Sequence, residues 1–575
     1  MSNLNLKAEQ AQTFDAIVVG SGISGGWAAK ELSELGLKTL VLERGKNVEH
    51  VTDYKTANLD PWDLPNRGVT SKKEIEEHYP KQSRTGYTIN EADKNFFIKD
   101  SDHPYLESQR FDWMRGYQLG GRSLTWGRQS YRWSPMDFEA NAKDGFGVDW
   151  PVRYWDIAPW YDRVEAFAGI SGAKRGLKQL PDGVFLPPMA MSCVETHFTQ
   201  QVEAKITGRA VTIGRTAHLT GKLPHENVGG RTNCLYRNKC RRGCPYGGYF
   251  SSLSATLPAA RVTGNLTIVT DAIVHEVIYD RDQGKATGVR VINRQTNEQT
   301  EFFAKVIFLC ASAIASASIL MQSKSDRFPN GLGNDSGELG HNIMDHHLEV
   351  GASGTFKGFY DKYEKGRRPN GIYIPRFRNL GRDSEMKEFI RGYGYQGYSS
   401  RENWRRGIAE AKVGGRVKDA KMVPGEWTLG LEGFGECLPN HENKMTLDYD
   451  YTDKWGLPTV KFDAAFGDNA LRMREDIKDQ AAEMLEAAGF VDIGRFDHGA
   501  NMGLGIHEMG TARMGRDPKT SVLNKWNQIH ACTNVFVTDG SFMTSSACQN
   551  PSLTYMAFTA RASHYAADQL KKGEV

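Results

Sequence analysis

Three glycines and one acidic residue near the start of the chain have the types and spacing that bind a dinucleotide. The glycines lie in Gly20-Ser-Gly22-Ile-Ser-Gly25, and Glu43 follows about 20 residues later. Gly20 suits a tight turn, Gly22 lets the backbone approach a pyrophosphate, and Gly25 lets a helix lie close to a sheet. Glu43 suits the hydroxyl pair of a ribose and would repel a 2′-phosphate. We therefore predict a nucleotide site at these residues.

A cluster of thiols is the second group that could do chemistry. Cys234, Cys240 and Cys244 form the pattern Cys-x5-Cys-x3-Cys-Pro, whereas the other cysteines of the eight are scattered. A disulfide would leave one thiol over, and a structural zinc site needs four ligands. Thiolates suit iron–sulfur clusters, and three thiolates match a cluster of three irons. The basic residues between the thiols would offset the charge of a cluster or form a solvated loop: Lys239, Arg241 and Arg242.

The glycine motif requires a strand, a helix and a second strand around it, and the sequence predicts all three. Residues 14–19 form an apolar run, residues 24–35 form a helix ended by Gly36, and residues 38–43 form the second strand. A glycine string alone would indicate only a turn, so these flanking elements support nucleotide binding. Amides at the start of the helix would face the phosphates.

The rest of the chain predicts an α/β framework. Strands are expected at residues 266–277, 286–291, 305–310 and 535–537, and helices at 312–321 and 468–488. Residues 120–127 form a loop of small residues that a flat ligand could approach. Asn550-Pro551 begins a helix that continues to about Leu570, with Asn550 as the N-cap and Pro551 at the first position. That helix start is a candidate site for stabilising negative charge.

Length and composition indicate a large protein without nucleic acid or membrane partners. A chain of 575 residues exceeds what one core usually holds, so two domains are expected. The net charge of +3 gives no electrostatic reason to bind nucleic acid or a membrane. No apolar run approaches the ~18 residues of a membrane helix. Residues 1–14 lack the basic and apolar regions of a secretory signal, so the chain alone predicts a cytoplasmic protein.

These motifs together resemble the glucose–methanol–choline (GMC) oxidoreductases over nearly the whole chain. The resemblance implies an α/β fold with a Rossmann-like FAD-binding domain and a discontinuous substrate domain built on an antiparallel sheet. The FAD-binding domain would comprise residues 14–135, 230–345 and 500–575, including the cysteine-rich segment 234–245; the substrate domain would comprise 136–229 and 346–499. The C-terminal motifs are the most specific: His507-Glu-Met-Gly-Thr511, Asp539-Gly540-Ser541 and Asn550-Pro-Ser-Leu-Thr554.

The resemblance also implies the residues of the site. The catalytic pair would be His507 and Asn550, with His507 as the base for a hydroxyl group, Asn550 orienting that hydroxyl, and the flavin accepting a hydride. Thr125 stands where pyranose oxidases attach FAD through a histidine, so FAD is expected to bind without a covalent link. Besides Asn550, the residues expected to bind FAD are Gly20, Gly22, Gly25, Glu43, Arg44, Gly120, Gly121, Ser123, Thr125, Val274, Asp539, Gly540, Pro551 and Thr554.

A His/Asn pair resembles pyranose oxidases and bacterial sugar dehydrogenases. The cysteine segment resembles the one that holds a three-iron, four-sulfur (3Fe-4S) cluster in FAD-dependent glucose, fructose and glucoside 3-dehydrogenases. We therefore expect an FAD-dependent sugar or glycoside dehydrogenase, with carbon C3 of a glucoside as the preferred position. The alternatives are a pyranose-type or glycoside oxidase that uses oxygen directly, and a non-catalytic electron-transfer subunit with flavin and cluster.

Related dehydrogenases also suggest partners for this chain. A small signal-bearing subunit and a cytochrome or quinone-linked acceptor are expected, so the chain would be periplasmic through co-export, or cytoplasmic without it. His341, His346 and His347 form a further histidine group. A metal site is conceivable there, but we expect surface or packing roles for all three.

Overall fold

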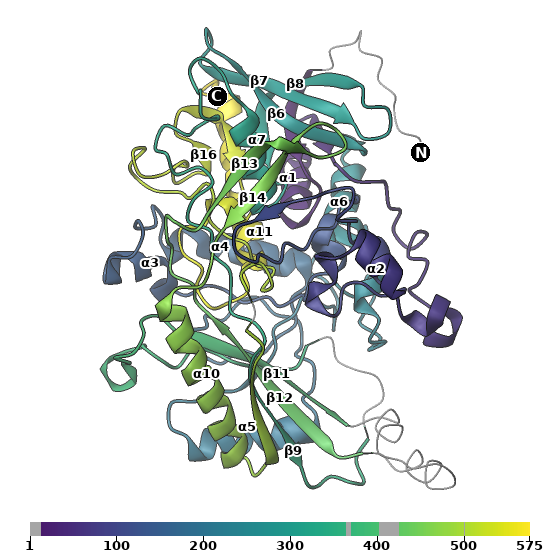
Figure 1. Cartoon of the computed structure of the whole chain (residues 1–575), viewed down its shortest axis with the longest axis vertical. Coiled ribbons are helices and arrows are strands. Elements are labelled where there is room, and N and C mark those ends of the chain that lie inside the picture. The colour runs from purple at the N-terminus through teal and green to yellow at the C-terminus, as the bar shows by residue number, and fades with distance from the viewer. Residues whose placement is uncertain (1–12, 364–369, 402–424, 500) are drawn as a thin grey trace.

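The structure is a computed structural model that describes residues 13–363, 370–401, 425–499 and 501–575. Its described residues form an eight-stranded, a six-stranded and a three-stranded sheet, with helices packed around them. The eight-stranded sheet lies at one end of the long axis and the six-stranded sheet at the other (Figure 1). The three-stranded sheet lies in the same half of the molecule as the eight-stranded sheet in this view.

The eight-stranded sheet is the predicted nucleotide-binding framework. Neighbouring strands run parallel along the path β17-β8-β1-β2-β5, while β16 pairs antiparallel with β17 and the β6–β7 hairpin extends antiparallel from β8. The strands are β1 (Thr13–Val19), β2 (Thr39–Leu42), β5 (Leu266–Val269), β6 (Ala272–Asp280), β7 (Lys285–Asn293), β8 (Gln299–Leu309), β16 (Gln528–Ile529) and β17 (Cys532–Val537).

The predicted β-α-β unit is present as β1, α1 (Ile23–Glu34) and β2. Both strands are almost wholly buried, which explains why their sequences are continuous apolar runs. A Cβ atom on Gly25 would lie 1.9 Å from the carbonyl oxygen of Gly20. Only glycine therefore lets α1 start this close to the turn after β1.

One predicted strand is wrong. Residues 266–277 were expected to be continuous, but the chain forms β5, turns, and continues as β6. Asp271 in the turn has a left-handed φ of 57°, and its amide donates to the carbonyl oxygen of Gly45. β5 is only partly buried, and the turn takes just Thr270 and Asp271, so the two short apolar runs look like one strand and do not reveal the change from a parallel to an antiparallel neighbour.

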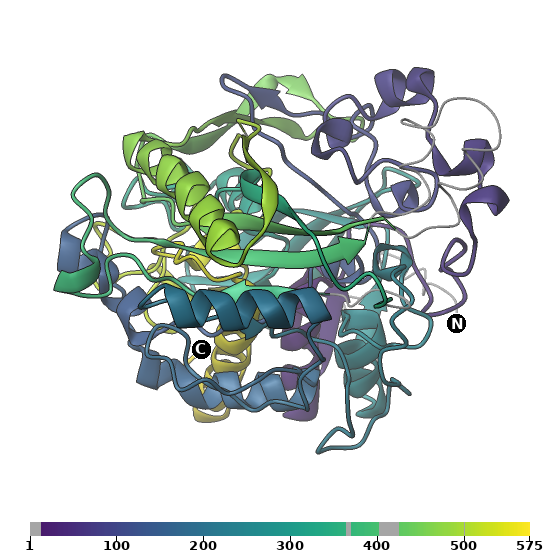
Figure 2. The ribbon, with the colours of Figure 1, turned by 90° about the horizontal axis from the view of Figure 1, so that it is seen from below.

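The six-stranded sheet is antiparallel throughout, as expected for the substrate side of this fold, in the order β15-β9-β12-β11-β10-β4. Helices α5 (Cys193–Lys205) and α10 (Asp468–Ala487) lie in front of this sheet when the molecule is viewed from below (Figure 2). Its strands are β4 (Thr212–Ile213), β9 (Val350–Phe356), β10 (Ile372–Ile374), β11 (Tyr393–Arg401), β12 (Trp427–Gly435) and β15 (Val491–Asp497).

The alternation of side chains along β11 sends one face of this sheet toward the helices and the other toward the inside of the molecule. Tyr393 and Tyr395 bond to residues of α10, namely the Asp476 carboxylate and the Ile477 carbonyl oxygen. Gln396, the next residue, points to the opposite face, because successive side chains of a strand alternate. That face borders a cavity, with Gln396 on its wall.

The remaining elements complete the framework around the two large sheets. In the three-stranded sheet β14 pairs antiparallel with β13 and parallel with β3, and α11 packs against both α1 and α4. Their bounds are β3 (Leu106–Glu107), β13 (Lys444–Thr452), β14 (Pro458–Asp463), α2 (Lys72–His78), α3 (Pro135–Asp144), α4 (Tyr154–Ala168), α6 (Leu257–Val262), α7 (Ala313–Gln322) and α11 (Ser552–Lys572). The exact domain boundaries stay a prediction.

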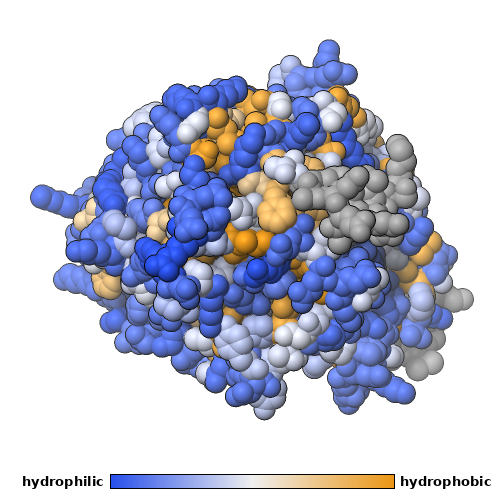
Figure 3. All heavy atoms as spheres, turned by 90° about the horizontal axis from the view of Figure 1, so that it is seen from above, coloured by the Kyte–Doolittle hydropathy of each residue, from blue (hydrophilic) through white to orange (hydrophobic). Residues whose placement is uncertain are grey.

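The surface is polar where it is seen from above. Hydrophilic residues cover most of that face, and hydrophobic residues occur in small groups between them (Figure 3). None of the helices in the described ranges is long and apolar enough to cross a membrane.

The glycine contact beneath α1 yields a stability prediction. Gly25→Ala should lower the free energy of unfolding by about 3 kcal/mol, at the upper end of ordinary single substitutions, because the new methyl group would overlap backbone atoms. The fall in the thermal unfolding midpoint measures it. Gly494→Ala is a control for added side-chain volume, because Gly494 has no left-handed φ and its Cβ would meet no atom within 4 Å. An unchanged midpoint for Gly25→Ala would contradict the packing described here.

Candidate active site

A single cavity of about 430 Å³ borders both the glycine motif and the predicted catalytic pair. At the nucleotide end its wall includes Gly20, Gly22 and Glu43, and at the other end it includes His507 and Asn550. Residues from distant parts of the sequence thus converge on one space. This is the arrangement needed to place a dinucleotide beside a reacting group.

The nucleotide end of the cavity leaves room next to the helix start. A Cβ atom built on Gly22 would meet no protein atom within 4 Å, in contrast to Gly25. Glu43 lines the same space, and its carboxylate accepts bonds from the Ser21 amide and hydroxyl, at 3.1 and 2.5 Å, and from the Gly45 amide, at 2.8 Å. Burial raises the pKa of Glu43. Glu43 therefore braces the glycine turn as well as facing the cavity.

Arg44 joins the nucleotide end to the hairpin between β13 and β14. Its guanidinium lies 3.1 Å from the Asp453 carboxylate and stacks over the rings of Tyr117 and Trp455. Arg44, Tyr117 and Asp453 also line the cavity. The hairpin loop therefore forms part of the wall at this end.

The structure brings most of the other predicted cofactor residues to the same cavity. Gly25, Gly120, Pro551 and Thr554 are not among the wall residues. Gly120 donates its amide to the Ser21 hydroxyl, and Thr554 bonds to the Tyr161 hydroxyl at 2.8 Å, so both support the wall from behind. The further predicted residues that line it are Arg44, Gly121, Ser123, Thr125, Val274, Asp539 and Gly540.

His507 is positioned by a buried carboxylate. The Asp345 side chain accepts hydrogen bonds from the backbone amides of Gly503 (2.7 Å), Gly505 (2.9 Å) and His507 (3.0 Å). The next residue, Glu508, forms a two-bond ion pair with Arg122 of the glycine-rich loop, at 3.2 and 2.9 Å. Two anchors, one on the backbone and one on the neighbouring side chain, thus hold the histidine.

Asn550 does not have the capping role predicted for it. Helix α11 begins at Ser552 with Pro551 as its N-cap residue, one position later than expected. The Asn550 amide is engaged in the cavity instead: its Nδ2 lies 3.2 Å from His507 Nε2, and its Oδ1 accepts from Gln396 Nε2 at 2.7 Å. The Asn550 oxygen that would cap the helix accepts from Gln396 instead, and Pro551 takes the N-cap position without a capping side chain.

The sequence analysis missed His346 as a member of the site. Its Nδ1 lies 2.9 Å from His507 Nδ1, with the two rings at 75°. Met344 and Met509 form an antiparallel bridge, and the same register places His346 opposite His507. The expected packing role holds for the neighbouring His347, which packs on Phe466, and His341 stacks on His441. His346 differs from His341 and His347 in that the pairing register places it opposite His507.

Gln396 and Gln129 were also missed. Gln396 Oε1 accepts from Gln129 Nε2 at 2.8 Å, and Gln129 Oε1 accepts from the Tyr131 hydroxyl at 2.6 Å. Isolated glutamines give no local sequence signal, so only the fold could reveal them. Tyr87, Trp126, Arg128 and Arg241 complete this end of the wall with aromatic and cationic groups.

Burial controls the protonation of the pair. His507 keeps part of its surface open to the cavity, but removal from bulk water, with His346 and Arg122 nearby, holds its pKa well below the ordinary value. Burial likewise lowers the pKa of His346 to about 4. Both imidazoles are therefore neutral at neutral pH, and a neutral ring can accept a proton. The pKa of Asp345 is raised to about 7, mainly by burial and further by Glu508.

The three clustered cysteines border a second, small cavity. Cys234, Cys240 and Cys244 are half-buried free thiols on its wall. Among the described residues no group of three or more His, Cys, Asp or Glu side chains is arranged to hold a metal ion. Lys239 bonds to Asp60 at 2.8 Å and Arg241 pairs with Asp93 at 3.4 Å. These cations are thus partnered by carboxylates.

Comparison with known proteins agrees with this arrangement. The family models of the GMC oxidoreductases match residues 14–348 and 439–559. The chain belongs to the GMC oxidoreductase family. GMC oxidoreductases bind FAD, and the cavity residues fit that cofactor: the space beside Gly22 admits a pyrophosphate, and Glu43 suits a ribose.

The chain is similar to proteins that are named for different substrates. The chain is 28% identical to 2-methyl-1,2-propanediol dehydrogenase from Mycolicibacterium austroafricanum, over 96% of this chain and 95% of that protein. It is 23% identical to the fructose dehydrogenase large subunit from Gluconobacter japonicus over the full length of both, and 26% identical to paromamine 6′-oxidase from Streptomyces fradiae, over 97% and 92%.

The fold itself is known from a solved GMC-type structure. The crystal structure of pyridoxine 4-oxidase from Mesorbium loti superposes with a TM-score of 0.58 at 18% identity, covering 97% of this chain and 99% of that one. This likeness concerns the fold alone.

The open space at Gly22 predicts a selective effect on FAD binding. Gly22→Ala should leave the thermal stability of the FAD-free protein unchanged, because the methyl group meets no protein atom. It should weaken FAD binding by about 10- to 100-fold, as overpacking of a fitted site does. FAD released by acid precipitation after gel filtration measures retention, with Gly494→Ala, a change away from the cavity wall, as the control. Full retention by Gly22→Ala would place the pyrophosphate elsewhere.

Proposed function

We propose that this GMC oxidoreductase oxidises a secondary alcohol group of a sugar or glycoside. The observation that carries the proposal is the facing pair of His507 Nε2 and Asn550 Nδ2, 3.2 Å apart, on the wall of the cavity that also reaches the nucleotide motif. A base and an orienting amide beside a hydride acceptor are what alcohol oxidation requires.

Each side chain of the pair has a distinct task. His507, neutral through burial, accepts the proton of the substrate hydroxyl at Nε2. Asn550 donates from Nδ2 to the oxygen of that hydroxyl, and its Oδ1 bond to Gln396 fixes the direction of the amide. The substrate carbon is thereby turned so that its C–H bond can face the cofactor.

FAD would supply the hydride acceptor when bound at this cavity. Gly20, Gly22 and Glu43 would hold its pyrophosphate and ribose, and Ser552, the first residue of α11, lines the cavity near the catalytic pair. Pro551 caps α11 without a hydrogen-bonding side chain, so amides of the first turn stay available to stabilise negative charge. Thr125, a wall residue, offers no imidazole for attachment, so we propose non-covalent binding.

The composition of the wall around the pair favours a polyhydroxylated substrate. Gln129 and Gln396 supply amides, Arg128 and Arg241 supply cations, and Trp126 supplies an aromatic face on which a sugar ring can stack. Two relatives, named fructose dehydrogenase and paromamine 6′-oxidase, are consistent with this class. For the position oxidised we propose C3 of a glucoside, on the overall resemblance to glucoside 3-dehydrogenases.

We further propose that Cys234, Cys240 and Cys244 hold a three-iron, four-sulfur cluster, which would pass electrons to an external acceptor. Support comes from the three thiols sharing one cavity wall and from the softness of thiolate ligands. Tyr249 borders this cavity and donates to the Leu124 carbonyl oxygen at 2.5 Å, and Arg241, between two of the thiols, lines the catalytic cavity. The two cavities are therefore neighbours.

A dehydrogenase of this kind needs partners outside the chain. We propose a small signal-bearing subunit that would carry the chain to the periplasm, and a cytochrome or quinone-linked acceptor. One relative is named a large subunit, in keeping with such an assembly. The rival is an oxidase that reduces oxygen directly, a function favoured by the name of another relative, paromamine 6′-oxidase.

The catalytic pair is tested by flavin reduction. His507→Ala should keep FAD and slow anaerobic flavin bleaching by a sugar by at least about 10²-fold, the usual loss with a general base. Asn550→Ala should slow it less, because the base remains. Stopped-flow absorbance with a panel of sugars and glycosides measures both. Wild-type rates in both variants would contradict the proposed mechanism. If no sugar bleaches the flavin of the wild-type protein, the result would favour an electron-transfer subunit.

The cysteines are tested by iron content. The wild-type protein should contain about three irons per chain and a paramagnetic signal that sugar abolishes. Cys240→Ser should lose them, keep sugar-dependent flavin bleaching, and slow reduction of a cytochrome. Cys193→Ser, a change at the one half-buried cysteine outside the cluster, is the matched control. Iron-free wild-type protein that forms peroxide as fast as it consumes sugar would identify the oxidase.

A further inference from the structure

The hydrogen bonds around His507 have a direction that two backbone carbonyls decide. His346 Nε2 lies 3.1 Å from the carbonyl oxygen of Ser546 and 3.0 Å from that of Ala547. Carbonyl oxygens only accept, so His346 Nε2 must carry a hydrogen. Because burial keeps this imidazole neutral, its other nitrogen, Nδ1, carries none and is an acceptor.

The acceptor on His346 determines the tautomer of His507. The two Nδ1 atoms are 2.9 Å apart, so His507 Nδ1 must donate to His346 Nδ1. A neutral imidazole has one hydrogen, and His507 Nε2 is then a bare lone pair. That lone pair is where Asn550 Nδ2 donates, at 3.2 Å. The reverse tautomers would bring a lone pair of His346 against two carbonyl oxygens.

The same direction continues through the wall of the cavity. The Tyr131 hydroxyl donates to Gln129, Gln129 to Gln396, Gln396 to Asn550, and Asn550 to His507. Each amide has its oxygen toward the preceding donor and its nitrogen toward the next acceptor. Hydrogen bonds in such a chain polarise one another. Fixing the hydrogen positions at one end, on His346 and His507, therefore fixes the donor and acceptor roles along the chain.

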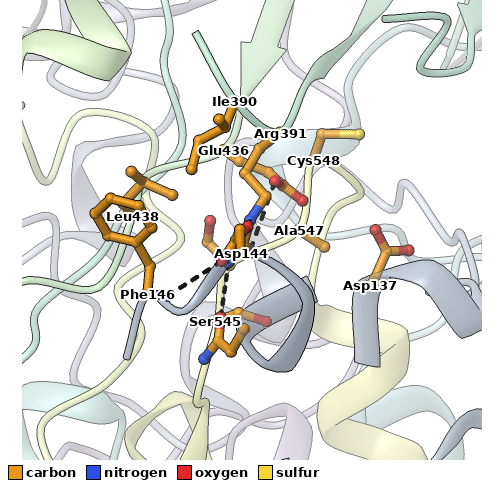
Figure 4. A network of polar contacts seen from close by, with 12 residues as sticks. Asp137, Asp144, Phe146, Ile390, Arg391, Glu436, Leu438, Ser545, Ala547 and Cys548 are labelled. Carbon is orange, nitrogen blue, oxygen red and sulfur yellow. Dashed lines mark hydrogen bonds and ion pairs between the residues drawn. The ribbon is translucent and has the colours of Figure 1, made fainter. Parts of the chain in front are cut away.

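The two carbonyl groups that fix the end of this hydrogen-bond chain belong to Ser546 and Ala547, and Ser546 is anchored to a neighbouring segment. Ser546 exchanges two hydrogen bonds with the backbone of Cys437, both at 3.0 Å. Figure 4 shows Arg391 between Asp144 and Glu436, beside the stretch that carries Ala547 and Cys548. The Arg391 guanidinium bonds to Asp144 and lies 3.8 Å from Glu436, and all three are largely withdrawn from water. The Ser546 side chain thus ties this segment to the backbone of Cys437 and holds it beside His346.

We infer that His346 is a positioning residue that holds the hydrogen of His507 on Nδ1 and so keeps Nε2 unprotonated, with a lone pair that can take the proton of the substrate hydroxyl. His346 itself is buried and is not among the residues that line the cavity. The inference rests on the proposed function for the identity of the proton, whereas the tautomer follows from the hydrogen bonds between two neutral rings and does not depend on the substrate.

Two variants of equal shape separate the hydrogen bond from packing. In His346→Asn the side-chain oxygen can occupy the place of Nδ1 and still accept from His507, whereas His346→Leu has the same branching and no acceptor. His346→Leu should lower kcat at least about tenfold with little change in KM. His346→Asn should restore most of the rate. Equal rates for wild type and His346→Leu, or equal losses in both variants, would overturn the proposal.

Nitrogen NMR of the holoenzyme labelled with ¹⁵N-histidine tests the tautomer without turnover. The wild type should carry hydrogen on His507 Nδ1 and on His346 Nε2, with assignment from His507→Ala. Hydrogen on His507 Nε2 would refute the inference even if no variant at position 346 folds. If His507→Ala reduces its flavin at the wild-type rate, the proposed function fails, whereas the NMR result still decides the tautomer.

Discussion

The geometry of the site depends on one buried carboxylate binding three backbone amides. Asp345 gathers the amides of Gly503, Gly505 and His507, so it shapes the loop that carries the base. The loop needs glycine for this: a Cβ atom on Gly505 would lie 2.5 Å from an Asp345 oxygen, and Gly503 has a left-handed φ of 91°. Because Asp345 precedes His346, the same contact brings the second histidine into place.

That contact also links the two large sheets. Asp345 and His346 directly precede β9 of the six-stranded sheet, while Arg122, paired with Glu508, belongs to the loop beside the nucleotide motif. Gln396 of β11 reaches across to Asn550 at the start of α11. The proposed catalytic pair is therefore held by polar contacts from both sides of the cavity. A shift of either sheet would misdirect the amide or the imidazole, and catalysis is sensitive to such small displacements.

Burial gives the base its protonation state at the expense of basicity. A histidine with a lowered pKa is neutral over the whole physiological range, so it is always able to accept a proton, but it accepts that proton less strongly. Asp345 is the carboxylate that could raise the basicity of His507. Its oxygens instead accept hydrogen bonds from backbone amides, and its own pKa is raised. Asp345 thus acts on the position of His507 more than on its charge.

Local features of the sequence determined the nucleotide-binding half. The β1-α1-β2 unit, Glu43 and the helix that became α11 follow from apolar runs, glycines and one proline, all acting within a few residues, and the family resemblance assigned His507 and Asn550. The same signals failed where two strands are separated by only two residues, as in the turn at Asp271. The partners of the pair were decided by tertiary structure. His346 meets His507 across 161 residues and Gln396 meets Asn550 across 154, through strand register and sheet packing. Neither register nor packing is a property of any one segment, because each depends on how two segments bury their surfaces against one another.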